Sequence, residues 1–255
     1  NLHEEAERLS DNATALLRHF ERQGARTDLV STPQERVEAA FDAAGHHFLA
    51  IEAGGVASVA EVIEGMEGLD AGAARLARDR LTRYAEDAAR LPLGPFLAAA
   101  AAVDFNPEAL IGMGGGDVAL VLRRLASLPE GGAEGVPGFG LAICDAAGAL
   151  IFRRRIPAFS VPRYGAGCAL WPLYGALARP MVPDLAVLEQ PDGARFRAWA
   201  VAAPVGATGF GAQPVMQAVM LLRAVPEDEA LTQGPRPVGP GCEMCPREEC
   251  AARRG

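Results

Sequence analysis

The chain has 255 residues, a formal net charge of −8 and 50% hydrophobic residues. This length allows one large or two small domains, and the apolar content is ample for a buried core. The acidic balance excludes a chain that binds nucleic acid through its bulk charge. No apolar run reaches the length of a membrane span and no signal peptide opens the sequence, so we expect a cytoplasmic protein. Lysine is absent and all 24 positively charged residues are arginines, which we attribute mainly to codon use in a GC-rich genome, although arginine also suits phosphate recognition.

The first part of the sequence predicts helices. Residues 2–22 carry an amphipathic stripe that fits a connector or dimerisation helix and an ordinary packing helix equally well. Thr32 as a cap and Pro33 in the first turn predict a second helix that ends near Ala44. The short apolar run 46–51 is interpreted as a strand, and its two adjacent histidines would then point to opposite faces, which argues against a metal site.

Helical periodicity continues in residues 58–67, 71–90 and 117–128, with a short alanine-rich helix at 96–102. The segment 71–90 carries a row of arginines interleaved with carboxylates, which we interpret as a solvated helix face: Arg75, Arg78, Arg80 and Arg83. The glycine run 112–117 is interpreted as a loop because no strand precedes it.

A glycine-rich, acidic stretch at 129–137 marks a boundary, after which the periodicity changes. The pattern predicts a β-hairpin of 139–144 and 149–154, then a helix at 171–178. Strands are predicted at 185–189, 196–202 and 215–223, although a short helix would also fit the last of these. We therefore predict an α+β fold, compatible with a GAF-like sheet, with a helical region (1–129), a sheet domain (130–232) and a cysteine-rich tail (233–255).

The tail contains Cys242, Cys245 and Cys250 in a segment almost free of large apolar side chains. Such a segment cannot bury a core, so its thiols are expected to bind a metal. Structural zinc sites and iron–sulfur clusters usually need four thiolates, and five cysteines in total fit a reducing compartment better than a disulfide framework. We assign Cys168, in a glycine-rich loop, as the fourth ligand and Cys144, at the end of an apolar run, to the core. A zinc ribbon normally presents two C-x2-C pairs, so the single pair here favours a cluster over zinc.

At these residues the chain resembles the effector region of the short-chain acyl-CoA-responsive transcription regulators, a subgroup of the XRE-type helix-turn-helix proteins. The resemblance covers about half the chain, from roughly Ala98 onward, and is carried by Gly135–Phe139, Phe152–Arg155, Phe159–Ser160, Gly165–Tyr174, Asp192–Gly193, Trp199 and the three tail cysteines. It implies a [4Fe–4S] cluster on the four cysteines and an acyl-CoA bound by a GAF-like domain. It also implies a homodimer that contacts DNA only through a helix-turn-helix domain absent from this chain, without any membrane partner.

The same resemblance suggests the residues that would bind the acyl-CoA: Arg153, Arg154, Arg155, Phe159, Arg163, Tyr164, Trp171, Tyr174 and Trp199. Guanidinium groups suit the phosphates of coenzyme A, and aromatic rings suit its adenine or the acyl end. Because neighbouring residues of a strand alternate between faces, either Arg153 and Arg155 or Arg154 alone can face a pocket. The alternative is a charged edge strand with aromatic residues that belong to the core.

We expect a sensor domain of a transcription regulator and not an enzyme. No nucleotide-binding or hydrolase motif is present, and no catalytic residue can be named. Two alternatives remain at this point: a zinc-stabilised interaction module without a small-molecule ligand, and an enzyme that handles acyl-CoA.

Overall fold

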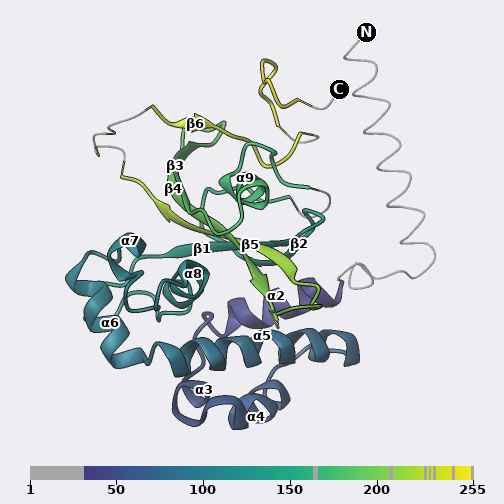
Figure 1. Cartoon of the computed structure of the whole chain (residues 1–255), viewed down its shortest axis with the longest axis vertical. Helices are drawn as coiled ribbons and strands as arrows, with labels where there is room; N and C mark the ends of the chain where they lie inside the picture. Colours follow the sequence, from purple (N-terminus) through teal and green to yellow (C-terminus); the bar gives the residue numbers. More distant parts are fainter. Residues whose placement is uncertain are drawn as a thin grey trace.

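The structure is a computed structural model that describes residues 32–162, 166–206, 209–226, 229, 231, 234–242 and 245–253. The helix expected at 2–22 lies outside these residues. The first part of the described chain is a helical layer (Figure 1): α2 (Pro33–Ala43), α3 (Leu49–Gly54), η2 (Gly55–Ser58), α4 (Val59–Glu64), α5 (Ala71–Arg90), α6 (Leu93–Ala102), α7 (Pro107–Leu110) and α8 (Val118–Leu125). None of the helices in the described residues is long and apolar enough to cross a membrane.

The second part forms a six-stranded mixed sheet with one packed helix, α9 (Pro172–Ala178). The sheet order is β2-β1-β5-β4-β3-β6, antiparallel except for the parallel β3–β6 pair. The strands are β1 (Phe139–Asp145), β2 (Leu150–Arg154), β3 (Asp184–Glu189), β4 (Arg195–Val205), β5 (Val215–Ala224) and β6 (Arg236–Pro237). The α+β class and the β1–β2 hairpin are confirmed, and the segment for which a strand or a helix would fit is the strand β5.

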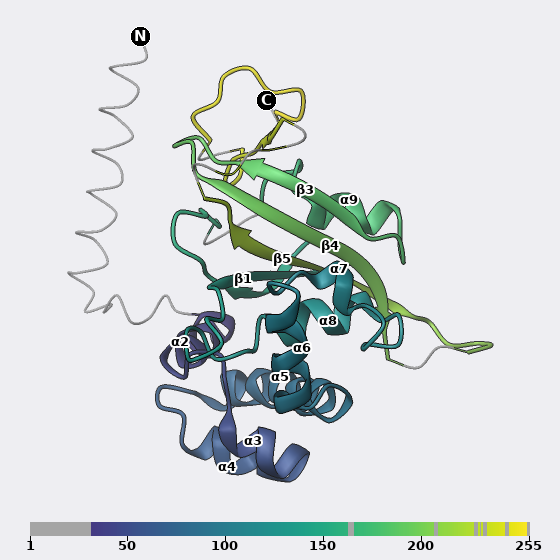
Figure 2. The same ribbon diagram turned by 90° about the vertical axis from the view of Figure 1, so that its left-hand side faces the viewer.

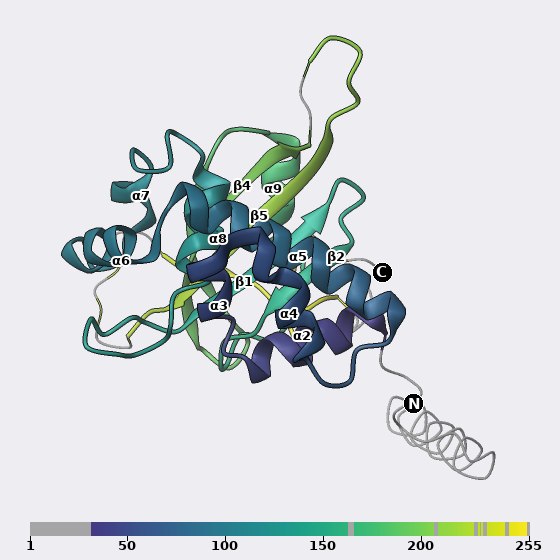
Figure 3. The ribbon, with the colours of Figure 1, turned by 90° about the horizontal axis from the view of Figure 1, so that it is seen from below.

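Both faces of the sheet are buried, each against a different partner. Along β1, Leu141 and Ile143 belong to the core that the sheet shares with the helical layer, whereas Ala142 and Cys144 belong to a second core under α9. Figure 2 shows α5, α6 and α8 on one side of the sheet and α9 on the other. Seen from the helical side in Figure 3, α3, α4 and α5 lie over the sheet. The alternation follows from strand geometry, in which successive side chains point to opposite faces.

The helix starts follow their local signals. Thr32 and Glu35 form a capping box at the start of α2, and Asp70 accepts a hydrogen bond from the Ala73 amide at the start of α5.

The strand predicted at 46–51 is wrong, because this segment is a turn followed by α3. His46 adopts a left-handed conformation (φ 57°) and donates its amide to the Phe41 carbonyl, which ends α2. The following residues bury Phe48 and Ile51 and leave Leu49 70% exposed, which is the one-sided burial of a helix.

The helical layer is joined internally by a buried ion pair. The Arg124 guanidinium on α8 is fully buried and donates two hydrogen bonds to the Glu52 carboxylate of α3, at 2.7 and 2.8 Å. Its Nε also donates to the Leu91 carbonyl, and the Tyr84 hydroxyl of α5 donates to Glu52. Burial is the main cause that raises the pKa of Tyr84, so this hydroxyl stays a donor. The network ties α3, α5 and α8 together beneath the sheet.

Replacing Glu52 by Gln should lower the free energy of unfolding by about 3 kcal/mol, because it leaves the buried Arg124 charge without its carboxylate. Urea denaturation followed by circular dichroism measures this. The matched control is Glu86→Gln, which removes a carboxylate from an exposed pair with Arg83 and should cost about 0.5 kcal/mol or less. Equal losses in the two variants would contradict a structural role for the buried network.

Candidate functional site

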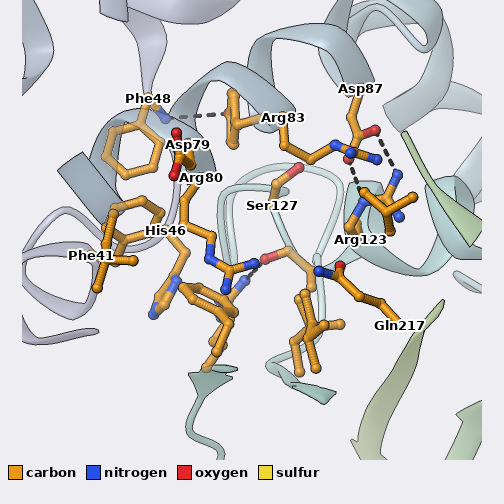
Figure 4. Close-up of a pocket in the computed structure, with 18 residues that line it drawn as sticks. Phe41, His46, Phe48, Asp79, Arg80, Arg83, Asp87, Arg123, Ser127 and Gln217 are labelled. Atoms are coloured by element: carbon orange, nitrogen blue, oxygen red, sulfur yellow. Dashed lines mark hydrogen bonds and ion pairs between the residues drawn. The ribbon is translucent and has the colours of Figure 1, made fainter. Parts of the chain in front are cut away.

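A cavity of about 290 Å³ lies between the helical layer and the sheet face that carries Leu141 and Ile143. Figure 4 shows side chains from both layers converging on it. Its lining residues come from α2, the turn after α2, α5, α8 and the turn after it, β1, β2, β4 and β5: Phe41, His46, Phe48, Leu76, Asp79, Arg80, Arg83, Tyr84, Asp87, Arg123, Ala126, Ser127, Leu141, Ile143, Phe152, Arg154, Val205 and Gln217. A concave site that combines aromatic and aliphatic side chains with converging polar groups is typical of a small-molecule pocket.

Part of the wall is aromatic. Phe41 contacts Phe48 edge to face, with ring centroids 5.0 Å apart, and contacts Phe152 in the same way at 5.7 Å. His46 packs against both Phe41 and Phe152 at 6.0 Å. Rings held by several such contacts form a rigid wall, suited to a small apolar group.

Basic residues give the cavity its polarity. Arg154 on β2 is buried and donates to the Ala126 carbonyl, and Arg80 on α5 donates to the Ile151 carbonyl at 2.9 Å. Burial lowers the pKa of both arginines, which means that the surroundings disfavour their charge. Burial also lowers the pKa of His46, despite its 2.7 Å hydrogen bond with Asp42, so His46 is mainly neutral at pH 7. The remaining buried charges of the wall form a pair, in which Arg123 donates two hydrogen bonds to Asp87, as Figure 4 shows.

Of the arginines predicted to bind a ligand, Arg154 lines the cavity. The register pairs Arg154 with Leu141 and Arg153 with Ala142, so these two arginines belong to opposite faces. Arg153 is buried and pairs with Glu38 of α2 at 2.9 Å, and Arg155 is exposed. Of the two arrangements that strand alternation allows, the structure has the one in which Arg154 alone faces the cavity. Arg163 lies outside the described residues, as does Tyr164.

The predicted aromatic residues lie elsewhere. Phe159, Trp171 and Tyr174 pack in or against the core under α9, on the other face of the sheet. Trp199 is on the helix-facing side, where its indole donates to Glu108 at 3.3 Å, but it does not line the cavity. These rings fill cores, in line with the alternative interpretation of the sequence.

Much of the cavity wall comes from the helical half, in which no ligand-binding residue was predicted from the sequence. The interpretation of the arginine row on α5 as a solvated face is wrong for Arg80, which is partly buried in the cavity wall. Arg83 also lines the cavity but pairs with Glu86 at the surface, and Arg75 and Arg78 are exposed. A partial signal existed for Arg80, which follows the buried Ala77 by three residues and precedes the buried Tyr84 by four. Spacing alone does not decide the matter, because the exposed Arg78 precedes the buried Leu81 by three residues.

The four cysteines predicted as ligands line a second, much smaller cavity, of about 20 Å³. The Cys168 amide donates to the Pro240 carbonyl at 3.1 Å, and the Trp171 indole donates to the Gly239 carbonyl at 3.0 Å. These bonds hold the loop before α9 against the tail. Arg247 also anchors the tail, because its guanidinium donates to the main-chain carbonyls of Glu189 and Gln190.

Two glycines are needed for this close packing. A Cβ on Gly239 would lie 2.5 Å from the Cys245 sulfur, and one on Gly167 would lie 2.4 Å from the Trp171 ring. Four thiols around one glycine-lined cavity are a donor set that fits zinc or an iron–sulfur cluster. Among the described residues, no group of three or more His, Cys, Asp or Glu side chains is arranged to hold a metal ion. The metal at these cysteines therefore stays a prediction.

Comparisons with known proteins agree with the sequence-based resemblance. Residues 127–254 match the family model of the short-chain fatty acyl coenzyme A regulator, C-terminal. A propionyl-CoA carboxylase regulator of Cereibacter sphaeroides is 33% identical over 193 residues, which cover 72% of this chain and 41% of that protein. The HTH-type transcriptional regulator PrpR of Mycobacterium tuberculosis is 27% identical over 213 residues, covering 76% of this chain and 42% of PrpR. The chain belongs to the short-chain fatty acyl coenzyme A regulator family.

The fold also matches a solved structure. A Mycobacterium tuberculosis transcriptional regulator superimposes with a TM-score of 0.64 at 24% identity, covering 88% of this chain and 69% of that one. At this identity the match shows a shared fold. The chain spans about two fifths of the length of the curated relatives it matches.

The fifth cysteine should behave differently from the other four. Cys144 is fully buried under α9, which confirms its assignment to the core, and burial raises the pKa of its thiol to about 11. Because the thiolate is the reactive form, Cys144 should stay unalkylated at pH 8 in metal-free, folded protein while the tail cysteines react with iodoacetamide. Mass spectrometry of tryptic peptides measures this, with urea-unfolded protein as the control in which all five react. Early alkylation of Cys144 in folded protein would contradict its burial.

Proposed function

We propose that this chain is the effector-binding domain of a transcription regulator and that it binds a short-chain acyl-CoA in the cavity between the helical layer and the sheet. The observation that carries the proposal is the cavity itself, which places an aromatic wall beside the buried Arg154 and the partly buried Arg80. The family description and the regulator names of the relatives support the same effector class.

The cavity suits the acyl end of such a ligand. At about 290 Å³ it is at the small end of the range for small-molecule pockets, so it can take an acyl group and part of the pantetheine arm but not a whole coenzyme. The edge-to-face contacts among Phe41, Phe48 and Phe152 would limit the length of the acyl chain. The adenosine and phosphate groups would remain outside.

Binding would act by shifting a conformational equilibrium. A ligand in this cavity touches α2, α5 and α8 on one side and β1, β2 and β5 on the other, so it favours the arrangement in which these layers fit it best. We propose that the regulator is a homodimer and that this shift reaches a helix-turn-helix domain outside this chain, which contacts DNA. Neither step requires catalysis by the chain, and we propose no enzymatic activity.

We also propose that Cys168, Cys242, Cys245 and Cys250 bind a [4Fe–4S] cluster beside α9. Support comes from the four thiols lining one cavity and from the glycines that leave room for them. When bound, the cluster supplies iron–thiolate bonds that fasten the tail to the loop before α9. Two hydrogen bonds of the chain itself orient the tail: Trp171 donates to the Gly239 carbonyl, and Arg247 donates to the Glu189 carbonyl of β3. Zinc at the same thiols is the second candidate, because its donor set is identical.

A GAF-like character of the sheet domain, and its boundaries at 129/130 and 232/233, remain predictions.

The metal proposal predicts a difference between two cysteine variants. Anaerobically purified wild-type protein should contain about four irons and four sulfides per chain. Cys168→Ala should lose most of this iron, because one of four ligands is removed. Cys144→Ala, the matched control in the core, should keep it. If the wild type contains one zinc and no iron, the bound metal is zinc. Equal iron in both variants would contradict the assignment of Cys168 as a ligand.

The ligand proposal predicts the effect of blocking the cavity. Gln217 on β5 lines the cavity and is only half-buried, so Gln217→Trp should obstruct it while the protein folds. Isothermal titration with propionyl-CoA should show an affinity at least about tenfold lower than that of the wild type. Val215→Trp, two residues away at an exposed position outside the lining, should bind like the wild type. If wild-type protein binds no acyl-CoA, or if Gln217→Trp binds it normally, the proposed site is wrong.

A further inference from the structure

In the part of the chain that the structure describes, most buried and nearly buried arginines pair with a buried carboxylate. Arg123 donates two hydrogen bonds to Asp87, at 2.7 and 2.8 Å, and Arg124 does the same to Glu52. Arg153 pairs with Glu38 at 2.9 Å. This is the usual arrangement, because an unpaired buried charge is costly.

Two arginines of the cavity have no buried carboxylate partner among the described residues. Arg80 donates to the Ile151 carbonyl and lies 5.5 Å from the centre of the Phe152 ring, but it forms no ion pair with a described carboxylate. Arg154 is 7% exposed and forms an ion pair at 3.5 Å with Glu130, whose side chain is 64% exposed, so solvent screens this pair. The surroundings lower the pKa of both, mainly through burial. Both guanidinium groups keep N–H donors beyond those used by these bonds.

The other charged groups of the wall do not compensate them. The lining contains four arginines and two aspartates. Asp87 is engaged by Arg123, and Asp79 is exposed at the rim of the cavity. Arg83 pairs with Glu86 at the surface, and His46, whose ring bonds Asp42, is mainly neutral at pH 7. The cavity therefore has an excess of positive charge in a largely apolar setting.

We infer that Arg80 and Arg154 together bind a carboxylate carried by the acyl group of the effector, so that the effector is a short-chain acyl-CoA with a second carboxylate at its far end. This inference rests on the proposed function and specifies its ligand. Arginine is suited to this task because its planar fork matches a carboxylate in two-point contact.

The depth and volume of the cavity indicate that the anion bound by Arg80 and Arg154 is an acyl carboxylate and not a phosphate of coenzyme A. A cavity of about 290 Å³ takes the acyl end of the ligand, and the phosphates lie at the opposite end of a long pantetheine arm. Arg154 is almost fully buried, and Phe41, Phe152 and Ile143 line the same space. A singly charged carboxylate on a short apolar chain fits these surroundings, whereas a phosphate is more highly charged and costs more to remove from water.

The test compares two ligands that differ by the carboxylate. Succinyl-CoA and butyryl-CoA both have four acyl carbons, and their affinities for the full chain are measured by isothermal titration. Wild-type protein should bind succinyl-CoA at least about tenfold more tightly, since hydrogen bonds to charged groups are the strong ones. Arg80→Gln and Arg154→Gln should each remove most of this preference and change butyryl-CoA binding little. Arg78→Gln, an exposed arginine of the same helix, is the control and should keep the preference.

The possible failures are distinguishable. Equal wild-type affinities for the two ligands, or a preference that survives both variants, would overturn the carboxylate assignment. Variants that weaken both ligands equally would place the arginines on the coenzyme moiety, and this also overturns it. Absence of binding by either ligand would overturn the proposed function and this inference with it. Circular dichroism melting curves establish that each variant is folded, and Arg80→Gln alone suffices if Arg154→Gln unfolds, because Arg80 is only partly buried.

Discussion

The alternation of side chains across the central strands determines how this protein is arranged. Because both faces of β1, β4 and β5 are buried, each strand must supply two different cores. The face under α9 carries the small residues Ala142, Ala198, Ala200, Ala202 and Ala218, which let that helix and the cysteine tail pack closely. The opposite face carries larger side chains and meets the helical layer, where the cavity lies. The alternation of side chains along the strands thus places the candidate ligand site and the candidate metal site on opposite faces of the sheet.

Strand β2 is the physical connection between these two sites. Its adjacent residues Arg153 and Arg154 point to opposite faces. Arg154 lines the cavity, whereas Arg153 pairs with Glu38 of α2 and donates to the Pro162 carbonyl at 2.8 Å. Pro162 lies near Gly241, in the segment that carries the tail cysteines. A shift of β2 on ligand binding would therefore displace both α2 and the tail that carries the cysteines, since packed elements move as units.

The sequence predicted local features well because they depend on local chemistry. The Thr32 cap, the β1–β2 hairpin and the buried position of Cys144 follow from short-range patterns that the structure retains. The convergence of Cys168 with the tail cysteines on one cavity could also be expected, because few thiols were available. The cavity could not be located in this way. Its wall joins α5 to β2, and Arg80 faces the cavity only because the helical layer packs on one particular face of the sheet. Which face of the sheet the helical layer covers depends on tertiary packing, and no local sequence pattern encodes it.

Hydrogen–deuterium exchange with and without propionyl-CoA can establish whether the effector binds between the helical layer and the sheet. A ligand at that position should slow amide exchange in residues 41–48, 76–87 and 141–154, which contribute side chains to the cavity wall. Residues 166–174 and 238–242, on the α9 side, should change much less. Protection confined to the α9 side, with no change around the cavity, would show that the effector binds elsewhere.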